Sequence, residues 1–196
     1  MWDERFSQAE PVYGETANAH LQAQVFRLKA GMKVLVPADG YGRNGIWLAR
    51  QGLQVHTVDL SPVGVERARK AAEAAGVAMK QEVADLATWN WPETEYDAVV
   101  SIFFHMLPAV RAKVHGAMLR ALKPGGIVIL EVFTLAQLRY ASGGPKQAEL
   151  LYATETLRND FAGAEVLQLE EKEVQLKEGR MHSGPGAVVQ AIFRRK

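Results

Sequence analysis

Short apolar runs alternate with amphipathic, alanine-rich segments, and this alternation restricts the possible fold more than any other feature of the sequence. The runs at 32–36, 53–58 and 96–103 have the length and composition of buried strands, and 44–51 and 108–122 have the pattern of helices. Repeated strand–helix–strand units give right-handed crossovers and a parallel sheet with helices on both faces. The sequence therefore predicts an α/β domain.

Three further elements continue this alternation. A helix begins at Ser61 and Pro62, because serine caps a helix and proline suits its first turn, and it ends at Gly76. Residues 77–83 predict the third strand. After a Lys-Pro-Gly-Gly turn, residues 127–133 form the most apolar strand of the chain.

The pattern changes after Phe133. Residues 140–149 are predicted to form a mobile loop, which either closes as a lid or simply connects two elements, and residues 154–161 predict a short helix. Two strands follow at 164–176 and 187–194. Because a short segment joins them, these two strands must be antiparallel.

Composition narrows the range of possible substrates and binding sites. The chain has 196 residues, 48% of them hydrophobic, and a net charge of +1 from 23 basic and 22 acidic residues. We expect a single domain spanning residues 1–196, with no general attraction to nucleic acid or anionic membrane, so a small molecule is the expected substrate. The absence of cysteine excludes disulfides, thiolate nucleophiles and zinc–thiolate sites, and no metal is expected. Without a signal peptide or a membrane-spanning stretch, a cytoplasmic location is expected.

A glycine-rich segment follows the first predicted strand. The run Gly40-Tyr41-Gly42-Arg43-Asn44-Gly45 opens a helix, where glycines let the backbone approach a ligand and free N–H groups favour an anionic group. It also matches the dinucleotide-binding pattern G-x-G-x-x-G, which indicates a nicotinamide- or flavin-dependent enzyme as an alternative. In that alternative the strand should run directly into the first glycine, but Pro37-Ala38-Asp39 intervenes. An ordinary glycine turn is the third interpretation.

Two carboxylates follow the next two strands. Asp59, with Leu60 after it, is placed to accept hydrogen bonds from both ribose hydroxyls of an adenosine group. Its alternative role is to cap the next helix, but the neighbouring serine can already cap that helix. Asp85, between Ala84 and Leu86, is placed to accept from the adenine amino group, while Leu60 and Leu86 enclose the ring. Taken alone, Asp85 is also typical of a loop aspartate.

Three successive strand ends therefore present small residues, a carboxylate and a second carboxylate, at the edge where open α/β sheets bind ligands. On these residues the chain resembles the class I S-adenosylmethionine-dependent methyltransferases over nearly its whole length. The matching segments are 34–44, 55–61 and 119–130. The last, with Leu-Lys-Pro-Gly-Gly at 122–126, is the most specific, since dinucleotide dehydrogenases have no standard counterpart to it.

The resemblance implies S-adenosylmethionine as cofactor and a Rossmann-like three-layer sandwich. It further implies a mostly parallel seven-stranded sheet with an antiparallel last strand, and a cofactor lying across the C-terminal edges of strands one to four. Ala38, Gly40 and Gly42 take the three small-residue positions, and Asn44 closes the motif. Residues 1–30 would cover the cofactor.

Within the class, the chain is similar to the small bacterial group that includes tellurite-resistance methyltransferases. Tyr13-Gly14, Gly42-Arg43-Asn44 and His182-x-Gly184 carry this similarity. The resemblance places Tyr13 over the cofactor, and simple packing of that ring is the competing interpretation. The identity of the substrate does not follow from this similarity.

One position departs from the family pattern. The family usually has an acidic residue at the end of strand one, which helps to hold the amino group of the methionine moiety, and this chain has Val36 and Pro37 there. We hypothesise that Asp39 takes over that charge.

The acceptor side is expected to include residues beyond the strand ends. Ser101 and His105 follow strand four, where the family has the loop next to the methyl group, and His105 is either a base or a structural side chain. Arg43 could meet an anionic acceptor or be a solvated surface residue. Arg180 and His182 could cover the site or lie in a solvated turn.

The sequence thus predicts methyl transfer to a small-molecule acceptor by in-line displacement. A thiol, a chalcogen oxyanion or another small metabolite is compatible with this prediction, and only some of these acceptors need a general base. The alternatives are a nicotinamide-dependent oxidoreductase and a non-catalytic S-adenosylmethionine-binding protein.

Overall fold

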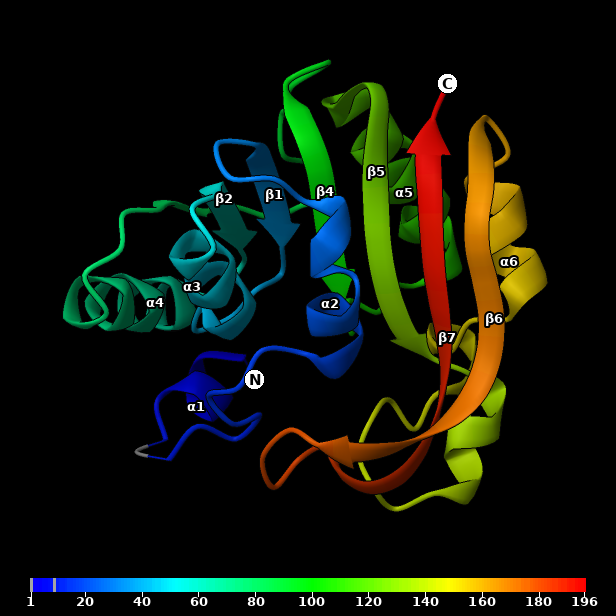
Figure 1. Cartoon of the computed structure of the whole chain (residues 1–196). Helices are drawn as coiled ribbons and strands as arrows, with labels where there is room; N and C mark the ends of the chain where they lie inside the picture. The colour runs from blue at the N-terminus through cyan, green and yellow to red at the C-terminus, as the bar shows by residue number, and fades with distance from the viewer. Residues whose placement is uncertain (1, 9) are drawn as a thin grey trace.

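Strands and helices follow the predicted order along the chain (Figure 1). The computed structural model describes residues 2–8 and 10–196. Its elements are α1 (Trp2–Phe6), α2 (Ala19–Ala23), η1 (Val25–Arg27), β1 (Lys33–Pro37), α3 (Arg43–Arg50), β2 (Gln54–Asp59), α4 (Pro62–Ala74), β3 (Lys80–Val83), β4 (Tyr96–Ile102), α5 (Pro108–Ala121), β5 (Leu122–Phe133), η2 (Leu135–Arg139), η3 (Ala148–Leu150), α6 (Thr154–Asp160), β6 (Ala164–Lys177) and β7 (Ser183–Arg195). Among these residues, no helix is both long enough and apolar enough to cross a membrane.

One seven-stranded sheet organises the molecule, in the order β3-β2-β1-β4-β5-β7-β6. The strands from β3 to β5 are parallel, whereas β7 runs antiparallel to both β5 and β6. This confirms the mostly parallel sheet with an antiparallel last strand. The strand order reverses between β1 and β4, and such a switch point is where open α/β sheets bind ligands.

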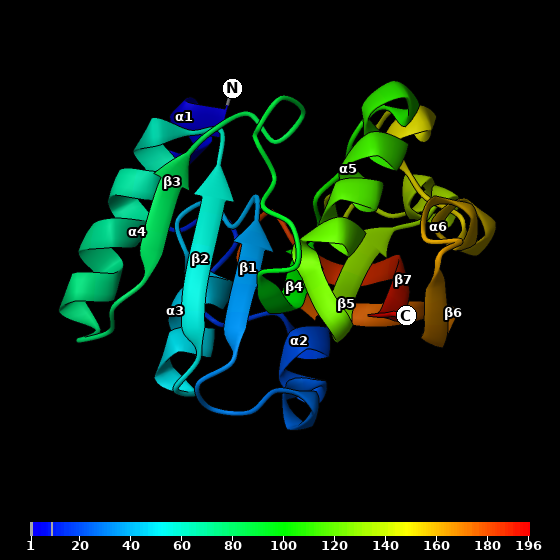
Figure 2. The same ribbon diagram turned by 90° about the horizontal axis from the view of Figure 1, so that it is seen from above.

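Helices cover both faces of the sheet, which confirms the three-layer sandwich (Figure 2). On one face, Leu21 of α2 and Leu48 of α3 pack against the strands. On the other face, Met118 of α5 and Leu157 of α6 are fully buried in a separate cluster. Burying a side chain of this size stabilises the fold by about 1.5–3 kcal/mol.

Three strands begin at least three residues away from the prediction, and one of them, β7, begins at Ser183 rather than at residue 187. β3 begins at Lys80 rather than at residue 77, because its pairing with β2 starts there. β5 begins at Leu122, so the predicted turn at 123–126 lies inside the strand. Pairing jumps from Leu122 to Ile127 on β5 while β4 advances by two residues, which makes these four residues a bulge.

Two segments meet at the C-terminal edge of the sheet, and we call residues 10–18 and 178–182 together the cover. The backbone N–H of Met181 donates to the carbonyl of Val12 over 3.0 Å. Gly179 has a φ of +68°, and a Cβ there would lie 2.3 Å from the backbone of the N-terminal segment. Figure 1 shows the loop between β6 and β7, in orange, reaching toward the N-terminal segment.

The predicted loop at 140–149 packs beside the cover. The hydroxyl of Ser142 donates to the carbonyl of Pro185, and the Gln137 amide donates to the carbonyl of Gly143. These contacts connect the loop to β7 and η2, and its mobility stays a prediction.

Candidate functional site

Three left-handed residues shape the loop between β1 and α3. Gly40 and Gly42 have φ values of +58° and +87°, and Ala38 has +56°. A Cβ on Gly42 would lie 2.8 Å from Ala68 of α4, and one on Gly40 would lie 2.7 Å from the ring of Phe6. Glycine is therefore needed at Gly42 for packing against α4 and at Gly40 for the close approach of α1 to the loop.

The left-handed backbone of Ala38 predicts a stabilising substitution. This conformation costs a non-glycine residue about 1–2 kcal/mol, so we expect Ala38→Gly to raise the free energy of unfolding by about 1 kcal/mol. Ala71→Gly is the matched control, because exposed Ala71 lies inside α4 and glycine there should cost about 1 kcal/mol. Urea unfolding measures both changes, and equal destabilisation by the two substitutions would contradict this account.

Asp59 ends β2 and is buried under the glycine loop. Its Oδ2 accepts the backbone N–H of Gly40 over 2.8 Å, and its Oδ1 accepts that of Ser61 over 2.9 Å. A carboxylate can accept about four hydrogen bonds, so the two amides orient this group and leave capacity for a ligand. Burial raises the pKa of Asp59. Ser61 also caps α4 and donates its hydroxyl to Asp3 of α1.

Asp39 lies in the same loop with one oxygen unused. Its Oδ2 accepts the backbone N–H of Gly45 over 2.9 Å, whereas the buried Oδ1 has no partner among the described residues. Burial raises the pKa of Asp39 to about 7. A buried carboxylate without a full set of partners is costly, and a cationic ligand group would satisfy it.

The residues after β3 are placed differently from one another. Asp85 is exposed, and its Oδ1 accepts the N–H of Ala87 over 2.9 Å, as in a loop turn. The side chain of Leu86 is buried in the core beneath α5, with Ala84 against the same cluster, whereas Leu60 is 57% exposed. The expectation that the Leu86 side chain encloses an adenine ring is therefore wrong, because that side chain packs into the protein.

Solved structures share this fold at low sequence identity. The chain is similar to a protein studied for the conversion of a disulfide bond into a thioacetal group during echinomycin biosynthesis (22% identity, 98% of this chain and 87% of that chain covered, TM-score 0.78). It is also similar to TehB from Haemophilus influenzae (18% identity, 91% and 62% covered, TM-score 0.75). A third is an S-adenosylmethionine-dependent methyltransferase from Methanosarcina mazei (16% identity, 92% and 98% covered, TM-score 0.72). No curated protein matches the chain.

Residues 34–126 match the family model described as a methyltransferase domain, and this region includes the glycine loop, Asp59 and Asp85. The chain therefore contains a methyltransferase domain. Its cofactor is S-adenosylmethionine, which supplies a methyl group on a positively charged sulfur when it is bound. The unpartnered oxygen of Asp39 suits the cationic amino group of this cofactor, so the residues present fit it.

The two residues predicted to lie near the acceptor, Ser101 and His105, are at the end of β4 and in the loop that follows it. Ser101 is fully buried, and its Oγ has no partner among the residues that the structure describes. His105 is fully engaged: Nδ1 lies 2.6 Å from the carbonyl of Leu150, and Nε2 accepts the N–H of Phe133 over 3.3 Å. Burial lowers the pKa of His105 to about 4. The structure thus favours the structural interpretation of His105 over a catalytic base.

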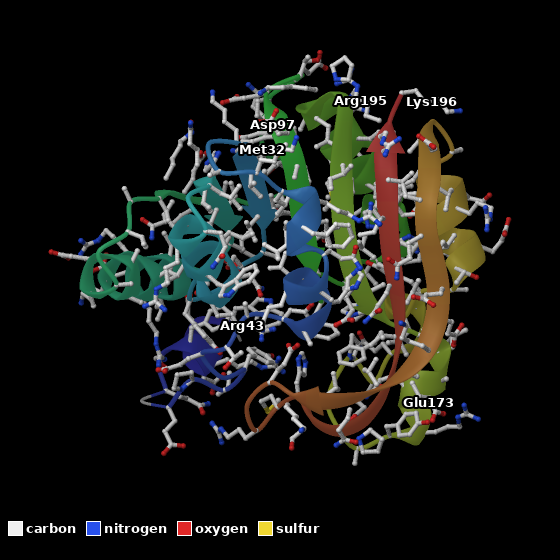
Figure 3. The ribbon with its side chains drawn as sticks, in the orientation of Figure 1. Met32, Arg43, Asp97, Glu173, Arg195 and Lys196 are labelled. Carbon is white, nitrogen blue, oxygen red and sulfur yellow. The ribbon has the colours of Figure 1, made fainter. Side chains whose placement is uncertain are left out.

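Arg43 begins α3 of the methyltransferase and points into the protein rather than into solvent. Its Nη2 donates to the carboxylate of Glu178 over 2.5 Å, and its Nη1 donates to the carbonyl of Thr16 over 3.0 Å. Figure 3 shows Arg43 near the cover, at the opposite end of the sheet from Asp97. The surface interpretation of Arg43 is wrong, and its charge is already paired with Glu178.

A buried polar network that the sequence analysis missed connects the cover to the sheet. Nδ2 of Asn18 donates to both Glu131 and Glu178, each over 2.7 Å. Gln190 of β7 donates to the other oxygen of Glu131 over 2.5 Å, and Asn44 accepts the backbone N–H of Asn18 over 3.0 Å. The sequence contains a signal for Glu131, which is a charged residue inside an apolar run. It contains none for Glu178, which lies in an ordinary polar turn.

Arg180 and His182 have different surroundings. Arg180 is exposed, as the turn interpretation expects, but His182 is buried. The His182 ring centroid lies 4.6 Å from that of Phe103, 5.2 Å from that of Phe133 and 4.8 Å from that of Tyr13. Burial lowers the pKa of His182. These four rings, two from the cover and two from the ends of β4 and β5, form an aromatic wall.

Proposed function

We propose that the methyltransferase transfers the methyl group of S-adenosylmethionine to a small-molecule acceptor by in-line displacement. The observation that carries this proposal is the unpartnered, buried Oδ1 of Asp39, at the switch point of the sheet and beside Asp59. A cationic cofactor group at this position would satisfy the buried carboxylate. The net charge of +1 gives no general attraction to a polyanionic substrate.

Each end of the cofactor has a proposed partner. Asp39 holds the methionine amino group, Asp59 accepts the ribose hydroxyls and Asp85 accepts from the adenine amino group, with Leu60 beside the base. Ala84 and Leu86 would contact the base through their backbone. The remaining proposed contacts are Tyr13, Ala38, Gly40, Gly42, Asn44 and Ser101.

The protein's own part in the reaction is to position the reactants and exclude water. Methyl transfer needs the nucleophile in line behind the methyl group, and holding two reactants in that geometry can supply about 7–11 kcal/mol of the barrier. Backbone contacts join the two segments of the cover to each other, and the proposed role of the cover is to keep water away from the C-terminal edge of the sheet. No protein nucleophile is required.

Ligand-induced stabilisation tests this proposal. We expect S-adenosylmethionine and S-adenosylhomocysteine to raise the melting temperature, because a ligand at about 100 times its Kd stabilises by about 2.7 kcal/mol, whereas NAD and NADP should not. A thermal-shift panel of the four ligands measures this. Stabilisation by NAD alone would support the oxidoreductase alternative and overturn the proposal. Binding of the cofactor without turnover of any acceptor would favour the non-catalytic alternative.

A further inference from the structure

Glu131 and Glu178, which we call the acid pair, lie where an acceptor would approach. The ends of β2 and β3 carry the residues proposed for the nucleoside, so the acceptor must come from the β4–β5 side of the switch point. Glu131 is on β5 at the end of β4, because its carbonyl accepts the N–H of Phe103 over 2.7 Å. The acid pair is therefore next to the loop that follows β4.

The acid pair is assembled from separate elements. Glu131 comes from β5 and Glu178 from the loop between β6 and β7, and one amide nitrogen of Asn18 lies 2.7 Å from each carboxylate. Both side chains are buried, at 3% and 7% exposure. Burying two neighbouring carboxyl groups costs several kcal/mol unless partners offset it, and here Asn18, Gln190 and Arg43 are those partners. Buried carboxyl groups with shifted pKa values are found more often at functional sites.

The charges around the acid pair disfavour an anionic acceptor. Glu131 is faced by Arg43 from α3, by Glu178 from the β6–β7 loop, and by the uncharged amides of Asn18 before α2 and Gln190 on β7. The guanidinium of Arg43 is already bound to Glu178. His182 lies 4.0 Å from Glu178, and burial lowers its pKa, which favours the neutral ring. Two carboxyl groups against the one guanidinium of Arg43 therefore disfavour an oxyanion beside the acid pair.

We propose that the acid pair receives the proton of the acceptor, and that the acceptor is a neutral thiol or phenolic hydroxyl on an apolar or aromatic body. This inference rests on the proposed function and names its substrate class. Tyr13 and Phe103, the two partly exposed rings of the aromatic wall, supply the surface for such a body, and the buried rings of Phe133 and His182 pack behind them.

The step balances with the groups present. The proton of the S–H or O–H group passes to a carboxylate oxygen of the acid pair. The lone pair left on sulfur or oxygen forms the new bond to the methyl carbon, the bond from that carbon to the sulfonium breaks, and its electrons stay on the departing thioether. The carboxyl group then releases the proton to solvent.

The acidity of Glu131 suits this role. Burial and the neighbouring Glu178 raise the pKa of Glu131 to about 7, even though the amides of Asn18 and Gln190 favour its ionised form. A proton acceptor works best when its pKa is near the working pH. The acceptor reaction should therefore show an acidic limb near pH 7.

The test uses the full chain with saturating S-adenosylmethionine and follows formation of S-adenosylhomocysteine. The probes are 2-phenylethanethiol and 4-methylphenol as neutral acceptors, and selenite as the oxyanion. We expect turnover of a neutral probe to exceed that of selenite. For Glu131→Gln we expect kcat to fall by about 100-fold, because general acid–base groups contribute about 10²–10⁴. The Kd of the cofactor should change far less than kcat, because Glu131 is not itself a proposed cofactor contact and reaches one, Asn44, only through Asn18.

Two further variants separate proton transfer from a structural role. Glu131→Asp keeps a carboxyl group and should retain the acidic limb at a reduced kcat, whereas Glu131→Gln should lose it. Glu171→Gln, on the exposed side of β6, is the matched control and should change nothing. Faster turnover of selenite, no turnover of either neutral probe, or an unchanged pH profile in Glu131→Gln would overturn the inference. Failure of the parent protein to bind S-adenosylmethionine would instead overturn the proposed function.

Discussion

Asp59→Ala is expected to weaken S-adenosylmethionine binding by about 100-fold or more. Each hydrogen bond to a charged group contributes about 1.5–3 kcal/mol, and Asp59 is proposed to accept two from the ribose. The substitution also leaves the backbone N–H groups of Gly40 and Ser61 without their acceptor, at about 1–3 kcal/mol each. We therefore expect a lower melting temperature together with the lost affinity. Calorimetric titration and thermal unfolding measure the two effects.

Two control variants make this result specific. Asp59→Asn keeps one acceptor oxygen and should lose less affinity and less stability than the alanine variant. Asp97→Asn changes a carboxylate at the opposite end of the sheet, where it accepts from Lys33 and Lys123, and should leave cofactor binding unchanged (Figure 3). Unaltered cofactor affinity in Asp59→Ala would refute the proposed ribose contact.

Cofactor affinity is expected to depend on pH through Asp39. Burial raises the pKa of Asp39 to about 7 in the free protein, and a bound ammonium group would lower it by favouring the charged form. Binding below pH 7 must then release a proton, so affinity should rise with pH by up to about tenfold per unit between about pH 5 and pH 7. Above about pH 8 the gain should end, because the cofactor's own α-amino group loses its proton there.

Calorimetry in buffers of different ionisation enthalpy counts the released protons directly. We expect nearly one proton at pH 5.5 and fewer at pH 7.5, as follows from a free-protein pKa of about 7. Asp39→Asn should remove most of this release and weaken binding at pH 7.5. A smaller release of the same sign should remain, because burial also raises the pKa of Asp59. Proton uptake on binding would contradict the assignment of Asp39.

The order and direction of the strands were predictable because each depends on local patterns. The apolar run at 127–133 forms the buried part of β5, and the short connection between the last two strands forces β6 and β7 to be antiparallel. The start of β5 was not predictable in this way. Leu122 joins the strand by pairing with Tyr96, across a bulge that the Lys-Pro-Gly-Gly sequence also accommodates as an ordinary turn.

The candidate site was predictable only where a residue's role depends on its place at a strand end. Asp59 ends β2, and its burial beneath the glycine loop agrees with the predicted position. Arg43 and His182 depend on tertiary partners instead. Glu178, far away in the sequence, binds Arg43, and three aromatic rings surround His182. No local pattern shows either contact, so their burial could not be derived from the sequence alone.

The side chains of Leu86 and His105 illustrate the same limit. Leu86 follows a carboxylate at a strand end, as a residue next to a base would, but the loop before β4 turns its side chain into the core. His105 lies beside two phenylalanines in the sequence, and only the positions of Leu150 and the β5 backbone show that both ring nitrogens are engaged. Such distinctions depend on which backbone atoms lie nearby in space.

A crystal structure of the methyltransferase bound to S-adenosylhomocysteine tests the central claim most directly. We predict the ribose hydroxyls within hydrogen-bonding distance of Asp59, the adenine beside Asp85 and the amino group of the methionine moiety at the unpartnered oxygen of Asp39. A nucleoside bound at another edge of the sheet, with these three carboxylates away from it, would contradict the account.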